Sequence, residues 1–281
     1  MTALFGLLAA VSCVDAYLET GEDLVPVSLS VTSLETKAGA QLTPRTENTM
    51  RDLWILQYNS DNEICLKIPV DLEADELSTT VKGLSLRPGR STLVVIANFL
   101  ELEPDVQYPW PGALEALYST PIDVGLDLDG DGPEHLVMVG TRAVDVKAGM
   151  DIGMMLSRVC CKLTLVVHQD GDAFSDLSLQ VVNAARPFTI HSSKDALEEE
   201  DLMDYAAETI SGTVPSGRAN AVTRYYYFCE NLSSDPDMQT MVRVSAKRNG
   251  TRRSMLVPVT SHGGVYRNTN YTLDLTLRPD E

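Results

Sequence analysis

Apolar and polar residues alternate in several short stretches of the chain, most regularly between residues 25 and 34. Positions 25, 27, 29 and 31 are valine or leucine, and positions 28, 30 and 32 are serine or threonine. This period of two is typical of a strand with one buried face. Pro26 has no N–H to donate to a neighbouring strand, so we expect the strand of residues 25–34 at a sheet edge.

A polar connection, residues 35–50, separates this stretch from RDLWILQYNS (51–60), which is apolar enough on both faces for a central strand. The connection contains glycine, proline and Arg45 and is bounded by Arg51, a composition typical of an exposed, cleavable loop. An arginine-specific protease cutting after Arg45 or Arg51 would sever the first strand and leave an open groove in its sheet. These two arginines are therefore the candidate processing sites.

Short runs with strand character continue to the end of the chain and are separated by turn signals. Two stretches, 113–119 and 192–210, have helical character, the second with acidic residues in its early turns. The pattern pauses near residues 147–151, where we place a domain boundary. Many short strands and little helix predict an all-β protein of the β-sandwich type. The remaining strand-like runs are 63–70, 92–100, 135–146, 156–167, 177–188, 221–231, 240–248, 254–260 and 271–277.

The first twelve residues, MTALFGLLAAVS, are apolar but shorter than the roughly 20 residues that cross a membrane. They are typical of the apolar core of a signal peptide, although the usual basic start is missing. Ala10-Val11-Ser12-Cys13 has the small residues that precede an acylated cysteine, which predicts lipid attachment at Cys13. Residues 13–24 then form an acidic tether. The alternative is that the cysteine stands there by chance.

Composition narrows the possible functions. The chain has 281 residues, enough for one large domain or two of ordinary size, and a formal net charge of −18. Such a charge repels nucleic acid, whose binding needs a basic surface. It suits an exported protein, because net charge keeps it soluble at a cell surface.

Four further cysteines, Cys65, Cys160, Cys161 and Cys229, lie in apolar runs. Cys160 and Cys161 are adjacent, and in a strand their side chains point to opposite faces. We therefore expect buried free thiols. One disulfide is the alternative that an exported protein permits. The spacing of the four does not match a zinc site.

One motif has the character of a ligand site, the aspartate turn (Asp127, Asp129 and Asp131) in the segment DLDGDGPE. It begins like an EF-hand loop, but position twelve is Met138, where a bidentate glutamate is needed. A polar turn between strands is the favoured interpretation, and weak calcium binding is the alternative. We expect no other metal site and no cofactor.

The sequence contains no G-x-S-x-G elbow, no P-loop and no H-E-x-x-H, and its four histidines are scattered. We therefore expect that the protein is not an enzyme. Two aromatic features have two interpretations each. Trp110 stands between prolines, either as an exposed anchor or packed over the end of a sandwich. The run Tyr225–Phe228 is either a sugar-stacking platform or a strand segment whose alternation places half of its side chains in the core.

Several segments, taken in their order along the chain, resemble the fimbrillins, the type V pilins of Bacteroidales, and among them a fimbrillin-like subfamily of surface lipoproteins. The resemblance covers most of the chain. It implies two tandem seven-stranded β-sandwich domains, transthyretin-like or Ig-like, at residues 25–150 and 151–281, with short helices in loops. The acidic residues behind Cys13 resemble the surface-export signal of Bacteroidales lipoproteins. The resemblance rests on the lipoprotein-like leader, the first strand with its arginine loop and RDLWILQYNS, LSRVCCKLTLVV (156–167), YYYFCENL (225–232) and VYRNTNYTLDLTL (265–277).

For function, the resemblance implies a structural component of a cell-surface fimbria, or pilus. Such a protein is held in the outer membrane by an acyl anchor and assembles with other fimbrial subunits through β-strand exchange. Stalk fimbrillins continue past the final strand with a donor segment, so the ending YTLDLTLRPDE fits a tip or anchor subunit that adheres to a host or bacterial surface ligand. The alternative is a non-polymerising surface lipoprotein that binds a glycan or a host protein.

Overall fold

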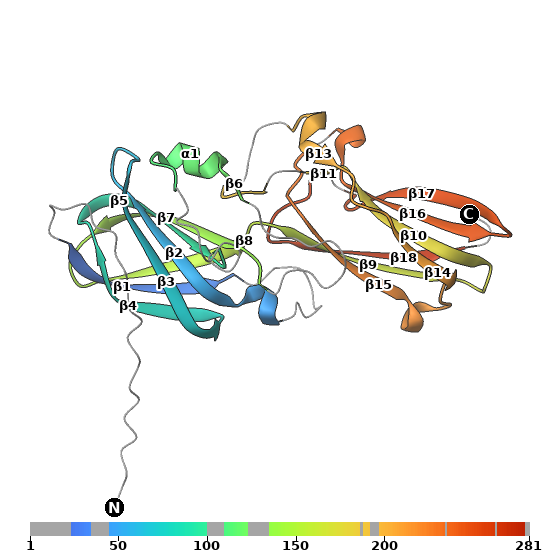
Figure 1. Ribbon diagram of the computed structural model, residues 1–281, viewed down its shortest axis with the longest axis horizontal. Helices are drawn as coiled ribbons and strands as arrows, with labels where there is room; N and C mark the ends of the chain where they lie inside the picture. Colours follow the sequence, from blue (N-terminus) through green and yellow to red (C-terminus); the bar gives the residue numbers. More distant parts are fainter. Residues whose placement is uncertain are drawn as a thin grey trace, which may run out of the picture. The chain divides into compact units, whose positions relative to one another are not determined.

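The computed structural model describes residues 24–34, 45–99, 110–122, 135–185, 188–191, 197–233, 235–261 and 263–278 (Figure 1). These residues form an all-β protein with a single short α-helix, α1 (Leu114–Ser119), and a few 3-10 turns, which confirms the predicted class. No helix among them is long and apolar enough to cross a membrane. The chain divides into two compact units. Unit 1 draws on Met1–Ser33, Thr49–Leu114 and Gly140–Leu156, and unit 2 on Leu34–Asn48, Glu115–Val139 and Ser157–Glu281.

Unit 1 is built on a seven-stranded sheet in the order β3-β2-β5-β7-β8-β1-β4 (Figure 1). In β1, β3 and β8 the buried side chains alternate along the strand, whereas β2 and β5 bury consecutive residues on both faces. The strands are β1 (Val25–Ser33), β2 (Met50–Tyr58), β3 (Ile64–Glu76), β4 (Ser78–Leu86), β5 (Gly89–Ala97), β7 (Met138–Val146) and β8 (Met150–Arg158).

Strand β2 has the central position that its apolar sequence predicts. It pairs antiparallel with β3 on one side and with β5 on the other. Nearby, Trp110 is buried, with its ring 5.6 Å from Trp54 and 4.9 Å from Phe99 between centroids. Of its two interpretations, packing against the core is therefore correct, and the exposed anchor is wrong.

The prediction that the first strand lies at a sheet edge is wrong. Strand β1 pairs antiparallel with β4 and parallel with β8, so it has neighbours on both sides. Pro26 is tolerated because it is only the second residue of the strand, and the parallel ladder with β8 begins one residue later, at Val27. The Pro26 carbonyl is still used, since it accepts a hydrogen bond from the Gly149 N–H at 2.7 Å.

Unit 2 has two sheets, one in the order β14-β10-β16-β17 and the other in the order β15-β9-β18. Their facing side chains form one apolar core. The strands are β9 (Cys161–Gln169), β10 (Phe174–Val182), β14 (Glu208–Thr213), β15 (Val222–Phe228), β16 (Met241–Arg248), β17 (Thr251–Pro258) and β18 (Asn270–Leu277). Two-residue strands form two further small pairs, β11 (Ala184–Ala185) with β13 (Leu202–Met203), and β12 (Phe188–Thr189) with β6 (Pro121–Ile122).

The prediction of a helix within residues 192–210 is wrong for the part of this segment that the structure describes. From residue 197 onward the chain forms a 3-10 turn, Glu199–Asp201, then β13 and the start of β14. The acidic run occupies only this single turn. Strand pairing of β14 with β10 and of β13 with β11 then overrides the local helical character.

Candidate functional site: the first strand and its anchored connection

Strand β1 fills the space between two strands of its sheet. The side chains of Val27, Leu29 and Val31 are fully buried, while those between them face outward. Val25, at the start of the strand, is only half-buried. If β1 left, β4 and β8 would each expose an unpaired edge beside an apolar slot.

The cost of removing β1 follows from these contacts. Burying an aliphatic side chain of this size stabilises a fold by about 1.5–3 kcal/mol, so three of them contribute about 5–9 kcal/mol before conformational entropy is counted. The two ladders add main-chain hydrogen bonds, and the side chains of Ser30 and Thr80, and of Thr32 and Ser78, are hydrogen-bonded to each other between β1 and β4. Loss of β1 without replacement would therefore open the sheet, whereas a strand of the same alternation would restore these contacts.

The connection that follows β1 returns to described structure at the 3-10 turn η1 (Arg45–Asn48). Residues 35–44 and the side chain of Arg45 lie outside the described part. Two residues after Arg45, the side chain of Glu47 is buried in unit 2. The Glu47 carboxylate accepts hydrogen bonds from Arg158, at 3.1 Å, from Lys162, and from the Tyr227 hydroxyl, at 2.7 Å.

These four side chains, Glu47, Arg158, Lys162 and Tyr227, form what we call the Glu47 cluster. All four are buried. The guanidinium of Arg158 also donates hydrogen bonds to the side-chain oxygens of Asn268, at 3.2 Å, and Asn270, at 3.3 Å. Burial raises the pKa of the Tyr227 hydroxyl, and donation to the carboxylate raises it further.

The Glu47 cluster holds the chain immediately after Arg45. A buried charge is tolerated only when it is paired and hydrogen-bonded, and here one carboxylate lies between two cations. Removing the carboxylate would leave both cations buried. The cluster therefore fixes one end of the connection, while β1 belongs to the other unit.

Sequence reasoning missed this cluster, although one signal was available. Arg158 and Lys162 interrupt the apolar segment LSRVCCKLTLVV at a spacing of four. Cations within an apolar run need a buried counter-ion, because an unpaired charge is very costly there. Nothing local identifies Glu47 as that counter-ion, since it is separated from Arg158 by 111 positions.

The second candidate processing site, Arg51, lies inside β2. Its neighbours Met50 and Asp52 pair with Glu76 and Asp71, and its own N–H donates to the Asn98 side chain at 2.9 Å. Its guanidinium pairs with Asp75 at 3.1 Å. A main chain held in a sheet resists proteolysis, which argues against a cut after Arg51. A cut after Arg45 stays a prediction.

Cys13 and the aspartate turn lie outside the described residues, so both stay predictions. Within the described residues, no group of three or more His, Cys, Asp and Glu side chains is placed to hold a metal ion.

Three of the described cysteines, Cys160, Cys161 and Cys229, are buried free thiols. Cys160 lies in a bend just before β9, not within the strand as expected, and packs with Leu136 and Tyr227. Cys161 belongs to the main core of unit 2, and its thiol donates to the Phe228 carbonyl at 3.0 Å. Burial raises the pKa of Cys160 to about 12 and also raises the pKa of Cys161 and Cys229. The predicted separation of the two adjacent thiols is confirmed, and Cys65, in β3, is half-buried.

The aromatic run is mostly core. Tyr226 and Phe228 pack in the main core of unit 2, as alternation predicts, but Tyr227 is buried as well. Tyr225 is the exposed member, at 46%, and the Lys162 amine lies 4.5 Å from its ring centroid. One exposed ring is too little for a stacking platform, so this interpretation has little support.

Comparison with solved structures identifies the fold. No protein-family model and no curated protein sequence matches the chain. A candidate cell adhesion protein from Parabacteroides distasonis is similar with a TM-score of 0.67 at 16% identity, over 90% of this chain and 88% of that one. The tip fimbrial protein Mfa3 from Porphyromonas gingivalis, with a C-terminal truncation, gives 0.64 at 13% identity, over 92% and 97%. A fimbrillin from the same organism gives 0.63 at 13%, over 90% of each chain. The chain therefore has the fold of the Bacteroidales fimbrillins and of candidate adhesion proteins related to them in structure.

Proposed function

We propose that this protein is a non-catalytic structural subunit of a cell-surface fimbria, placed at its tip or its anchor and assembled by β-strand exchange, with a role in adhesion. The observation that carries the proposal is strand β1, an internal strand whose connection contains Arg45 and is fixed two residues later by the Glu47 cluster. The fold supports it, because the similar structures include a fimbrillin and a fimbrial tip protein.

The proposed exchange has three steps. A protease cuts after Arg45, which separates β1 from the chain that begins at Thr46. The Glu47 cluster keeps the new N-terminus in place on unit 2. Strand β1 then leaves, and a strand from another fimbrial subunit enters between β4 and β8 by β-augmentation, with apolar residues at the positions of Val27, Leu29 and Val31. Lipid at Cys13 would tether an uncut subunit to the outer membrane.

Limited digestion with an arginine-specific protease tests the cut. N-terminal sequencing of the folded product should give Thr46. Arg45→Lys should abolish this product, while the matched variant Arg51→Lys should be cut like the original chain. Failure to cut the folded chain between residues 35 and 51 would contradict the proposal.

Peptide exchange tests the second step. After the cut, a peptide with the sequence VPVSLSVTSL should bind and restore the thermal stability of unit 1. A control peptide with the same composition but a scrambled order that removes the alternation should not bind, because no register then places all of its apolar side chains on the buried face. Equal binding of both peptides would contradict exchange into this slot.

One comparison favours a second candidate, a surface lipoprotein that binds a glycan and does not polymerise. A structure described as a candidate polysaccharide-binding protein from Bacteroides thetaiotaomicron has a TM-score of 0.53 at 9% identity, over 91% of this chain and 92% of that one. An uncut chain that binds surface polysaccharides in a glycan array would support this candidate. The structural support is weaker here, because Tyr225 is the single exposed ring of its aromatic run.

A further inference from the structure

Two of the buried cysteines lie opposite each other at the end of a pair of strands. Strand β15 runs antiparallel to β9, and the last pair of their register joins Phe228 to Cys161. One residue further along both chains, the same register sets Cys229 opposite Cys160. Cys160 is 3% exposed and Cys229 is 4% exposed, and both are free thiols in the structure. The two thiols are therefore neighbours across the end of this ladder.

The side chains of Cys160 and Cys229 lie on the same face of the sheet. Cys160 packs with Tyr227. Tyr227 precedes Cys229 by two residues, so these two side chains point to one face of an extended chain. Cys161 packs in the main core of unit 2, on the opposite face, where its thiol donates to the Phe228 carbonyl at 3.0 Å. Cys229 thus shares a face with Cys160 and not with Cys161.

Main-chain hydrogen bonds place the pair at a position that suits a disulfide. The Cys160 carbonyl accepts from the Asn268 N–H at 2.8 Å, on the side of β9 where β18 lies. Successive residues of a strand turn their N–H and C=O groups to opposite sides, so Cys161 bonds with β15 and the pair Cys160–Cys229 does not. The Cα atoms of such a non-hydrogen-bonded pair are about 4.5 Å apart. A disulfide spans Cα distances of about 4.4–6.8 Å, so the pair can be joined without moving the strands.

We propose that Cys160 and Cys229 form a disulfide when the chain meets a disulfide oxidant, and that this bond fastens β15 to β9 at the Glu47 cluster. In the sequence, Cys160 lies midway between the two cations of that cluster, and Cys229 follows its tyrosine by two residues. The bond would join the segments that carry three of the four cluster side chains. It needs only residues of unit 2. The supply of the oxidant alone rests on the proposed cell-surface function, because disulfides form outside the cytoplasm.

The oxidant is another disulfide, of a small thiol or of a protein, and the reaction is thiol–disulfide exchange. The thiolate of one cysteine attacks the oxidant and expels one of its thiols, which leaves a mixed disulfide. The thiolate of the other cysteine then attacks this mixed disulfide, forms the Sγ–Sγ bond and expels the second thiol. The two cysteines lose two protons and two electrons in all, and the oxidant is reduced to two thiols.

Burial determines when this exchange occurs. Burial raises the pKa of Cys160 to about 12 and also raises the pKa of Cys229, which the negative charge of a Cys160 thiolate raises further. Because exchange requires a thiolate, the folded and reduced chain should react slowly. Before β15 joins β9, both thiols are open to the oxidant. We therefore expect the bond to form as unit 2 folds.

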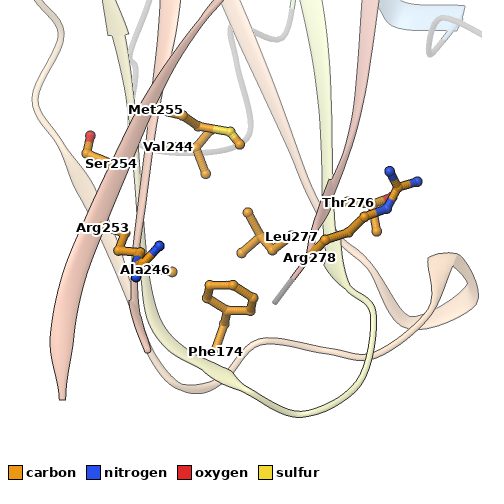
Figure 2. A pocket seen from close by; sticks show the side chains of 9 residues that line it. All are labelled: Phe174, Val244, Ala246, Arg253, Ser254, Met255, Thr276, Leu277 and Arg278. Atoms are coloured by element: carbon orange, nitrogen blue, oxygen red, sulfur yellow. The ribbon is translucent and has the colours of Figure 1, made fainter. Parts of the chain in front are cut away.

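Packing disfavours the competing bond between Cys161 and Cys229, because Cys161 would have to leave the core. The cavity of about 510 Å³ that Figure 2 shows in unit 2 lies beside Leu277 and Phe174. Leu277 pairs with Gln169 at the last position of β9, whereas Cys161 is its first residue. At the rise of a strand, the two ends of β9 are about 25 Å apart. This cavity therefore offers the Cys161 side chain no space to turn.

Refolding the full chain with oxidised glutathione tests the bond. After denaturation, alkylation of free thiols and digestion, mass spectrometry should find a peptide with Cys229 cross-linked to the peptide that contains Cys160 and Cys161. The cross-link should persist in Cys161→Ala and disappear in Cys160→Ala, and the two variants are matched because both positions are buried. A cross-link that persists in Cys160→Ala, or glutathione adducts without a cross-link, would overturn the proposal. Because the oxidant is supplied, the result does not depend on the fimbrial role.

Reduction of the cross-linked chain gives a second readout. In the folded chain the paired strands hold the two sulfurs together, whereas urea releases them. Opening half of the cross-links in the folded chain should therefore need a ratio of reduced to oxidised glutathione at least about tenfold higher than in urea. Equal ratios in the two states would show that the fold does not favour the bond, and they would overturn the proposal.

Discussion

Replacing Glu47 by Gln tests whether the buried ion network anchors the chain after Arg45. The substitution keeps the size of the side chain but removes its charge. It leaves Arg158 and Lys162 buried beside each other without their carboxylate. One of them would also face the NH2 group of the glutamine, which cannot accept a hydrogen bond. We expect the free energy of unfolding of unit 2 to fall by about 3–5 kcal/mol, the usual cost of removing one partner from a buried ion pair.

The geometry supports this magnitude. At 3.1 Å, the Arg158–Glu47 pair is worth about 5 kcal/mol of Coulomb attraction at an effective dielectric constant of about 20. Part of the loss is relieved, because Asn268 and Asn270 still accept from Arg158, and Lys162 lies next to the exposed ring of Tyr225. A loss of 3–5 kcal/mol is a large share of the roughly 5–15 kcal/mol that stabilises an ordinary domain.

Urea unfolding can report on the two units separately, because both tryptophans, Trp54 and Trp110, belong to unit 1 and their fluorescence follows the unfolding of that unit. In the Glu47→Gln variant, circular dichroism should show part of the β-structure unfolding at lower urea, while the tryptophan fluorescence transition changes much less. Glu200→Gln, at an exposed position in unit 2, is the matched control and should have little effect.

A second variant distinguishes the charge from the shape of the side chain. Adding Lys162→Met to Glu47→Gln removes one of the two buried cations that lost their counter-ion. We expect the double variant to recover at least about 1 kcal/mol of the free energy of unfolding. A loss below about 1 kcal/mol for Glu47→Gln alone would refute the reasoning, since it would show that the cluster does not hold the connection.

Four further predictions follow from the same principles. Trp110→Ala should destabilise unit 1 by about 3–5 kcal/mol, because a buried ring that packs on Trp54 is lost, and an unchanged urea midpoint would contradict this. Burial raises the folded-state pKa of Cys160 from its ordinary value of 9.0 to about 12, so the protonated thiol's contribution to stability is complete below pH 9 and is lost toward pH 12 at about 1.4 kcal/mol per pH unit. Urea midpoints between pH 8 and 11 should therefore fall less steeply in Cys160→Ala, and parallel curves would disprove it. Cys13→Ala should move the protein out of the membrane fraction, and mass spectrometry of the original should find lipid on Cys13; continued membrane attachment of the variant would count against lipidation. For the aspartate turn, melting curves with millimolar calcium and with chelator should coincide, whereas a rise of several degrees with calcium would identify a metal site.

Local patterns in the sequence were sufficient for the elements whose alternation is regular. Residues 25–34 and 51–60 lie in strands as predicted, and the predicted run 271–277 lies in the final strand β18. The short helix at 113–119 is also present, as α1. These predictions succeed because a period of two places side chains on alternate faces of any strand, whichever partner the strand finds.

Only the tertiary structure decided which segments meet. Strand β1 lies inside its sheet because β8 and β4 match its register on both sides, and Pro26 falls outside the parallel ladder. Residues 208–213 form a strand because β10 offers them a partner. The Glu47 cluster depends on residues far apart in the chain, and local propensity carries no information about such contacts. Sequence by itself therefore determined which faces of the strands are apolar, while the pairing of distant segments decided which strands lie side by side and which of those faces are buried.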